Sequence, residues 1–257
     1  MSLPIINIAA LTLVSLVILR MYSLYMKFTK PLIKGKLIKR YKRFFTDVNI
    51  DGVKVIAHCP NTGSMKGLLD EGNQVHLLKY DDSKRKLKYG LEIIKANKNL
   101  VGVNTHMANK IARHALENNL IKEFQNLDLI KSEVFFNEET RFDFYLEKKK
   151  SKMFLEVKNV TLFRDKKTSE FPDAVTSRGS KHLLTLIDAT KKGYKTYLLF
   201  LVQIQNMENF KIAKDIDSEY YNNYLKAKKA GVNFLAYRCK INSKEIFVEK
   251  KLKIIDE

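Results

Sequence analysis

The chain has 257 residues, of which 45% are hydrophobic and 29% charged, and its 47 Lys and Arg against 28 Asp and Glu give a formal net charge of +19. This length leaves room for a sizeable core and two modest domains, and the spread-out positive charge favours polyanionic partners, nucleic acid first and anionic lipid second. Two distant cysteines, Cys59 and Cys239, argue against a disulfide framework or zinc site and fit a reducing compartment, and the absence of P-loop, dinucleotide-binding and nucleophile-elbow motifs predicts no nucleotide cofactor and no serine hydrolase.

The first 25 residues form an apolar extension. Residues 3–19 are almost wholly apolar and are followed by Arg20 and a basic stretch from Lys27. The segment lacks the basic start and small-residue cleavage site of a signal peptide. It is either a short inner-membrane anchor that keeps the body in the cytoplasm, or the product of a mis-set start, with Met26 beginning the protein. We favour the second interpretation, so we expect a cytoplasmic protein with membrane contact only if residues 3–19 are retained.

Short strands broken by turns dominate residues 32–97. Strand-like runs occur at 37–47, 53–58, 75–80 and 87–96, separated by turn signals at 61–64, 71–73 and 81–83. Several short strands at this spacing are typical of a small barrel. We predict a barrel like the oligonucleotide-binding (OB) fold over residues 26–100.

The remainder, residues 101–257, alternates strands and helices. A helical connection over 101–126 contains a helix at 104–120, with Thr105 as a possible cap and an apolar stripe of Met107, Ile111, Ala115 and Leu116. We predict strands at 132–137, 141–147, 153–161, 194–203 and 232–237, and helices at 177–192 and 217–230 that end before Gly193 and Gly231. This order indicates a mixed sheet and an α/β (α+β) fold class.

Three charged residues are prominent in the strands at 141–147 and 153–161. The period of two along a strand puts Glu156 and Lys158 on one face. A loop of residues 148–151 would set Asp143 opposite Glu156 in an antiparallel pair, with the Lys158 ammonium beside them. Two carboxylates at that distance repel each other unless a cation lies between them, so the pattern predicts a divalent-metal site like that of metal-dependent nucleases.

An ordinary half-buried hairpin with one solvated face would show the same alternation. A functional site is favoured by the apolar run from Met153 to Val160, because a merely solvated charged pair is less expected inside such a run. Unpaired buried charge is also costly, which makes buried acids functional candidates.

Two segments of the predicted barrel are candidates for binding a nucleic-acid backbone. The run at 37–45 interleaves four cations with aromatic residues, suited to phosphates and bases, although a solvated strand face over a Phe core explains it equally well. The segment at 58–65 forms either a phosphate-binding nest or a plain turn. The candidate contacts are Lys39, Arg40, Lys42, Arg43, Asn61, Thr62 and Ser64.

A third basic cluster lies at the start of the helix predicted at 177–192. Arg178, Lys181 and His182 fall in its first turns, where backbone N–H groups also favour anions. Cations at this end of a helix are unfavourable for its stability, which suggests that an anionic ligand offsets them.

The chain resembles the sugar fermentation stimulation protein (SfsA) family. The matching stretches are Glu-Val-Lys-Asn-Val-Thr-Leu at 156–162, Phe-Pro-Asp-Ala-Val-Thr-Ser-Arg-Gly-Ser-Lys-His-Leu at 171–183, and the segments 37–44, 58–65, 84–87, 103–105, 131–133 and 231–237. The resemblance covers about residue 28 to the C-terminus. Proteins of this family typically start just before the Pro-Leu at 31–32, which supports Met26 as the true start.

The resemblance implies DNA binding with little sequence specificity, a regulatory link to sugar (maltose) metabolism, an OB-like barrel and a restriction-endonuclease-like α/β domain. By position, Glu133, Asp143, Glu156 and Lys158 match the nuclease-type acids and lysine. We therefore expect the three acids to hold Mg²⁺ (or Mn²⁺) for phosphodiester hydrolysis. The alternative is a catalytically inactive DNA-binding regulator on a nuclease-like scaffold.

Overall fold

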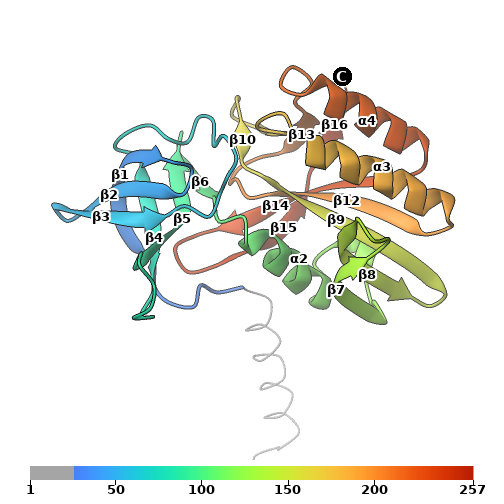
Figure 1. The fold of residues 1–257 in the computed structure, drawn as a ribbon, viewed down its shortest axis with the longest axis horizontal. Coiled ribbons are helices and arrows are strands. Elements are labelled where there is room, and N and C mark those ends of the chain that lie inside the picture. Colours follow the sequence, from blue (N-terminus) through green and yellow to red (C-terminus); the bar gives the residue numbers. More distant parts are fainter. Residues whose placement is uncertain (1–25, 257) are drawn as a thin grey trace, which may run out of the picture.

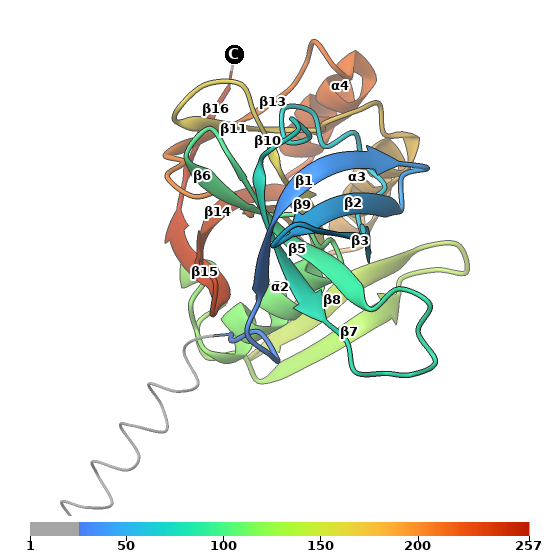
Figure 2. The same cartoon turned by 90° about the vertical axis from the view of Figure 1, so that its left-hand side faces the viewer.

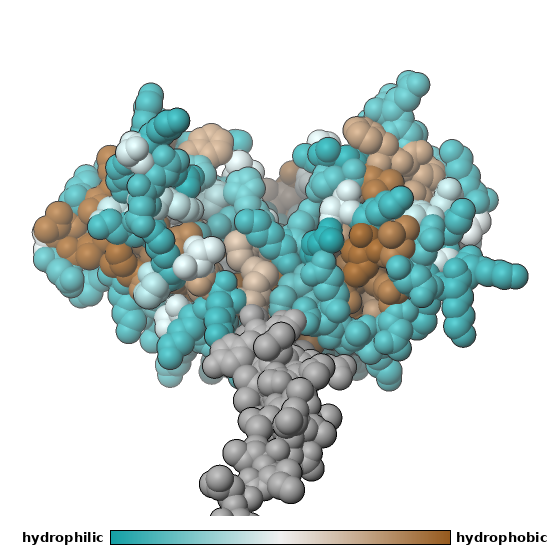
Figure 3. All heavy atoms as spheres, turned by 90° about the horizontal axis from the view of Figure 1, so that it is seen from below, coloured by the Kyte–Doolittle hydropathy of each residue, from teal (hydrophilic) through white to brown (hydrophobic). Residues whose placement is uncertain are grey.

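The structure, a computed structural model, describes residues 26–256, so the apolar extension at 1–25 lies outside the described residues. They form two lobes, an N-terminal barrel and a larger α/β domain (Figure 1). The space-filling view from below shows a notch between the lobes and a largely hydrophilic surface (Figure 3). Among residues 26–256, no helix has the length and apolar character needed to cross a membrane.

Five strands close the barrel, which faces the viewer in Figure 2. Their order is β3-β2-β1-β4-β5, and pairing of β3 with β5 closes the ring, while β6 (Asn99–Gly102) extends from β5. This arrangement confirms the predicted OB-like barrel. The five strands are β1 (Ile33–Tyr41), β2 (Phe45–Ile50), β3 (Val53–His58), β4 (Gln74–Lys79) and β5 (Tyr89–Ala96).

The segment predicted as one strand at 37–47 is in fact a hairpin. Lys42 and Arg43 have φ of 47° and 61° and reverse the chain between β1 and β2, so that Lys39 pairs with Asp47. The prediction of a continuous strand was therefore wrong. Lys and Arg are not typical turn residues and rarely adopt positive φ, so the sequence carries no signal for this turn. The two cations lie at the hairpin tip.

A mixed six-stranded sheet of order β15-β14-β12-β9-β8-β7 forms the centre of the second domain. Helix α2 (Met107–Glu117) covers one face, and α3 (Ser177–Lys191) and α4 (Ser218–Lys229) cover the other (Figure 1). The helices α3 and α4 end before Gly193 and Gly231, whose φ values are 88° and 96°, as predicted. The strands are β7 (Leu129–Phe135), β8 (Arg141–Lys148), β9 (Ser151–Val160), β12 (Lys195–Val202), β14 (Asn233–Ile241) and β15 (Ile246–Lys251).

Three smaller features were not predicted. Four short strands form a second sheet, and a 3-10 turn, Lys122–Phe124, follows α2. Thr105 does not cap α2; the cap position is His106, and the Thr105 hydroxyl instead donates to the carbonyl of Pro60 at 2.6 Å. The strands of the second sheet are β10 (Leu162–Phe163), β11 (Thr168–Phe171), β13 (Asn209–Ile212) and β16 (Lys253–Ile255).

The two domains share one hydrophobic cluster. It joins buried side chains of the barrel to buried side chains of β8, α3 and β12, so apolar packing crosses the domain boundary. The helix α2 and the opposite face of the sheet form a second cluster. Members of the shared cluster include Leu37, Val48, Leu91, Phe142, Leu183 and Phe200.

Candidate active site

Antiparallel pairing of β8 and β9 brings the two predicted acids together. The pairing ends at Phe144 and Leu155, so the next step in the same register places Asp143 beside Glu156, as predicted. Here the backbone N–H of Val157 donates to Oδ2 of Asp143 at 2.7 Å. The Asp143 carboxylate therefore accepts a hydrogen bond from a backbone N–H of β9 where the pairing of the two strands ends.

Asp143 is held from the opposite side by a residue that was not predicted. The amide of Asn109, on α2, donates to Oδ1 of Asp143 at 2.7 Å. Burial and the charge of Glu156 raise the pKa of Asp143 to about 7, against the opposing hydrogen bonds from Val157 and Asn109. The Asp143 side chain is thus poised between its charged and neutral forms near neutral pH.

Glu156 lies among cations. Its Oε1 accepts from Nζ of Lys158 at 2.8 Å and contacts Nδ1 of His182. Burial acts to raise the pKa of Glu156, but the Lys158 charge and the His182 contact outweigh it, and the pKa is lowered. Within the described part of the chain, its other oxygen, Oε2, is buried and has no hydrogen-bond partner.

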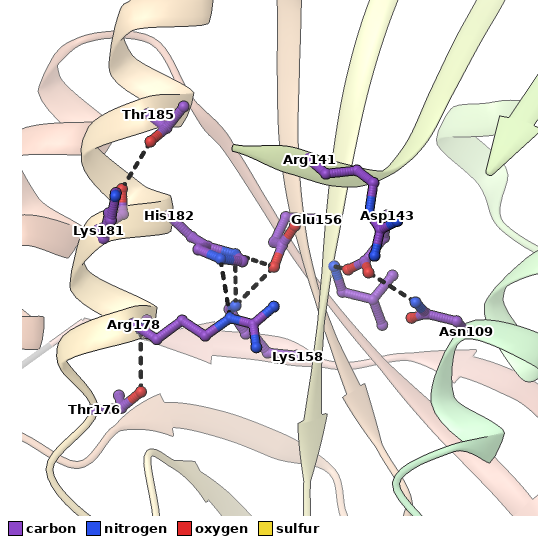
Figure 4. A network of polar contacts seen from close by, with 12 residues as sticks. Asn109, Arg141, Asp143, Glu156, Lys158, Thr176, Arg178, Lys181, His182 and Thr185 are labelled. Atoms are coloured by element: carbon purple, nitrogen blue, oxygen red, sulfur yellow. Dashed lines mark hydrogen bonds and ion pairs between the residues drawn. The ribbon is translucent and has the colours of Figure 1, made fainter. Parts of the chain in front are cut away.

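His182 connects Glu156 to the start of α3. Figure 4 shows Arg178, His182 and Lys158 on one side of Glu156, with Asp143 and Asn109 on the other. Nε of Arg178 donates to Nε2 of His182 at 3.4 Å, and Nζ of Lys158 lies 3.2 Å from Nδ1. The ring thus contacts Glu156 and Lys158 through Nδ1 and Arg178 through Nε2. His182 therefore orients the acid.

Glu133 is less closely integrated. By register it lies opposite Asp143 on β7, with a φ of 57°, but its side chain is 46% exposed and pairs with Nε of Arg141 at 2.8 Å. Asn109 lies 3.4 Å from its Oε1. Among residues 26–256, no group of three or more His, Cys, Asp or Glu side chains is placed to hold a metal ion. The structure thus brings together two of the three predicted metal ligands.

The predicted basic contacts fall into different environments. Lys39, Lys42 and Arg43 are exposed on the β1–β2 hairpin. Arg40 is half-buried, and its guanidinium donates to the carbonyl oxygens of Arg43, Gly63 and Asn61. Arg40 therefore holds the loop after β3 in place.

The loop at residues 61–65 binds a carboxylate of this chain. The hydroxyl of Ser64 and the backbone N–H of Met65 each donate to Oδ2 of Asp173 at 3.1 Å. A Cβ on Gly63 would lie 2.8 Å from the same oxygen, so a larger residue here would push Asp173 out of this contact. The loop has the donors of an anion site, and Asp173 uses two of them.

The other two predicted residues of this loop differ in burial. Asn61 is buried and its side-chain oxygen accepts from the backbone N–H of Gly63, whereas Thr62 is exposed. A cavity of about 560 Å³ lies between this loop, the β1–β2 hairpin and the segment leading to α3. Arg43, Thr62, Ser64 and Thr176 are among its lining residues.

Lys181 points to a different part of the site. Its Nζ pairs with Glu139 at 2.8 Å, across from α3 to the loop between β7 and β8. Of the three basic residues predicted at the start of α3, Arg178 and His182 therefore face Glu156, and Lys181 bridges to the β7–β8 hairpin.

Sequence comparison agrees with this architecture. Residues 106–245 match the family described as "Sugar fermentation stimulation protein RE domain", and residues 38–103 match "SfsA N-terminal OB domain". The chain belongs to the sugar fermentation stimulation protein family. A protein described as "Sugar fermentation stimulation protein homolog" from Pelagibacter ubique is 75% identical over 231 residues, which cover 90% of this chain and 100% of that protein. One from Alteromonas mediterranea is 44% identical over 238 residues, with the same coverage.

A solved SfsA structure has the same fold. The structure of Pyrococcus furiosus SfsA in complex with Ca²⁺ aligns with a TM-score of 0.82 and 24% sequence identity, covering 90% of this chain and 99% of that one. The family resemblance and the fold class expected from the sequence are thereby confirmed.

Asn109 is the residue of the candidate site that sequence reasoning missed. It precedes the buried Leu116 by seven positions, two helical turns, so it lies at the edge of the buried face of α2. An amide at the edge of a buried helix face can reach a polar partner on the sheet beneath, and its position was the only signal in the sequence.

Proposed function

We infer that this protein binds nucleic acid and hydrolyses phosphodiester bonds in a metal-dependent reaction. The observation that carries the inference is the adjacency of Asp143 and Glu156 on neighbouring strands, with Lys158 bonded to Glu156. Two titratable acids whose pKa values are displaced in opposite directions mark a site built for chemistry more than for stability.

The residues present suit a hard divalent cation such as Mg²⁺ or Mn²⁺. Oε2 of Glu156 is a buried oxygen for which the described residues provide no partner, and burial together with the Glu156 charge raises the pKa of Asp143, a repulsion that a bound cation would relieve. Mg²⁺ commonly binds one or two carboxylates plus water and phosphate oxygens, so two acids suffice. The Pyrococcus furiosus SfsA structure contains Ca²⁺, a cation with the same preference for oxygen. A bound cation would neutralise charge that develops on the phosphate and lower the pKa of water.

The surrounding side chains would divide the remaining work. Lys158 would orient or deprotonate the attacking water and stabilise developing negative charge. His182 fixes the rotamer of Glu156, and Asn109 fixes that of Asp143. Glu133, which pairs with Arg141, would help to orient the residues that bind the metal without binding it directly.

Basic residues of the β1–β2 hairpin and of α3 would hold the substrate backbone, and one of them, Arg43, lines the cavity. Lys39, Lys42 and Arg43 lie on the barrel hairpin and Arg178 on α3, and the net charge of +19 adds a general attraction for phosphates. Contacts of this kind carry no sequence information, which supports DNA binding with little specificity. A regulatory link to sugar (maltose) metabolism would operate through this binding. The proposal requires the cytoplasm as its compartment, and two buried free cysteines are compatible with it.

One observation favours a second candidate, a DNA-binding regulator without turnover. Within residues 26–256 the acids do not form a three-ligand group, and one oxygen of Glu156 already has two nitrogen partners. A nuclease-like site that has lost its activity would keep Glu156 paired with nitrogen donors in this way.

The deciding experiment is a cleavage assay with the purified protein and end-labelled single- and double-stranded DNA, in Mg²⁺, Mn²⁺ or EDTA. Glu156→Gln keeps the size of the side chain and removes its charge. Metal-dependent cutting that is lost in this variant is the expected result. Salt-sensitive binding with no cutting in either metal would instead establish the regulator.

A further inference from the structure

We propose that Phe135 and Arg141 form a base-stacking platform beside the acids, so that the nucleic acid taken by this site is single-stranded. This inference rests on the proposed function and adds the substrate class to it.

The platform consists of two side chains that face each other across the β7–β8 hairpin. Phe135 pairs with Arg141 in the ladder, and the Arg141 guanidinium carbon lies 5.6 Å from the centre of the Phe135 ring. Phe135 is 67% exposed, and the Arg141 side chain is 51% exposed. Both side chains therefore keep exposed surface that a ligand can reach.

A chain of hydrogen bonds ties the platform to the acidic site. Arg141 donates to Glu133 at 2.8 Å, and Asn109 lies 3.4 Å from the other oxygen of Glu133. The same amide donates to Asp143 at 2.7 Å. The orientation of Arg141 over the ring is thus fixed relative to the carboxylate that we expect to hold the cation.

The position along the strand also suits a nucleotide next to the reacting phosphate. Arg141 precedes Asp143 by two residues, a distance of about 7 Å on the same face of β8. An ion pair between Lys181 and Glu139, 2.8 Å long, holds the loop of this hairpin to α3. The base of a nucleotide whose phosphate lies at Asp143 would therefore reach Phe135.

Stacking of this kind selects unpaired bases. Aromatic rings and guanidinium planes bind the faces of bases in single strands, whereas in a duplex those faces are already covered by neighbouring base pairs. A second aromatic group lies at the barrel hairpin, where Tyr41 and Phe45 stack at 5.6 Å and Phe44 is 46% exposed. The same hairpin carries Arg43, which lines the cavity between the hairpin and the segment leading to α3.

The test measures binding without turnover, with the full-length protein in EDTA. The probe is a single-stranded oligonucleotide carrying 2-aminopurine, whose fluorescence falls when the base stacks on a ring, and the same oligonucleotide annealed to its complement is the comparison. Phe135→Ala removes the ring, Phe135→Tyr retains it, and Leu225→Ala removes another exposed apolar side chain, on α4. Thermal unfolding of each variant checks that it is folded.

Phe135→Ala should weaken single-strand binding roughly 5- to 100-fold and abolish the fall in 2-aminopurine fluorescence on binding. Phe135→Tyr and Leu225→Ala should bind like the original protein. Duplex binding should change little. Unchanged single-strand affinity in Phe135→Ala would overturn the platform. It would also be overturned if the substitution changed only the oligomeric mass in solution, because this face would then contact a second copy of the chain. These outcomes do not depend on cleavage: loss of cutting in every metal with the stacking effect intact would reject hydrolysis and keep the platform.

Discussion

At the scale of single residues, the site separates two carboxyl groups by their surroundings. Lys158 and His182 both contact Glu156 and lower the pKa of that acid, whereas burial and the Glu156 charge raise the pKa of Asp143 to about 7 against the hydrogen bonds from Asn109 and Val157. A cation that binds at Asp143 would compete with a proton there.

Replacing Asp143 by Asn should abolish metal-dependent cutting and leave DNA affinity unchanged or raised, because the substitution removes a charge that repels phosphates. Cleavage and binding of the same labelled DNA would be measured together. Asp188→Asn, an exposed acid of α3, serves as the matched control and should keep its activity. Cutting by Asp143→Asn at the original rate would remove Asp143 from the reaction.

A second buried acid, in the barrel, predicts a pH-dependent stability. Glu92 is 4% exposed and accepts two bonds from the amide of Asn104, and burial raises its pKa to about 7. Between pH 4.5 and 7 the folded protein retains a proton that the unfolded chain has lost. The free energy of unfolding should therefore fall across this window, by on the order of 3 kcal/mol.

Glu92→Gln should remove that part of the pH dependence and be more stable than the original protein at pH 8. Urea unfolding at pH 5 and pH 8 measures both quantities. Since Asp143 titrates in the same window, the informative value is the difference between the two proteins. An equal loss of stability in both would show that Glu92 ionises normally.

At the scale of elements, the contact between the loop at 61–65 and Asp173 joins the barrel to the segment before α3. A double-mutant cycle with Ser64→Ala and Asp173→Ala should give a coupling free energy of about 1 kcal/mol, because the hydroxyl and the carboxylate share a hydrogen bond. The exposed pair Lys181 and Glu139, treated in the same way, should give a smaller coupling, because solvent screens both charges. Additive effects of Ser64 and Asp173 would mean that the contact is not formed in solution.

The sequence was sufficient where an element is long and its period clear. Alternation along 153–161 predicted β9 and, with its hairpin, the register of Asp143 against Glu156. It failed where the signal is short or depends on tertiary contact: β10 has two residues, and the turn at Lys42 and Arg43 carries no glycine or proline. The pairing of Ser64 with Asp173 joins residues 109 positions apart, which no local pattern can show.

At the scale of the whole molecule, the charge of +19 predicts binding dominated by phosphate contacts. DNA affinity should fall roughly tenfold or more between 50 and 200 mM salt, because bound cations are released from the DNA. Fluorescence anisotropy over a salt series gives the slope, and Lys42→Ala with Arg43→Ala should make it shallower. A flat response would contradict phosphate binding by these residues.

The hydrophobic cluster that spans both lobes also limits how such a protein can be recombined. Leu37 of the barrel and Leu183 of α3 belong to the same packed group, so their shapes have to match. A chimera that joins this barrel to the second domain of a distant relative would combine side chains that were never selected together, and cavities or clashes at the junction would destabilise it. Domain exchange should therefore succeed only when the facing core residues are transplanted along with the barrel.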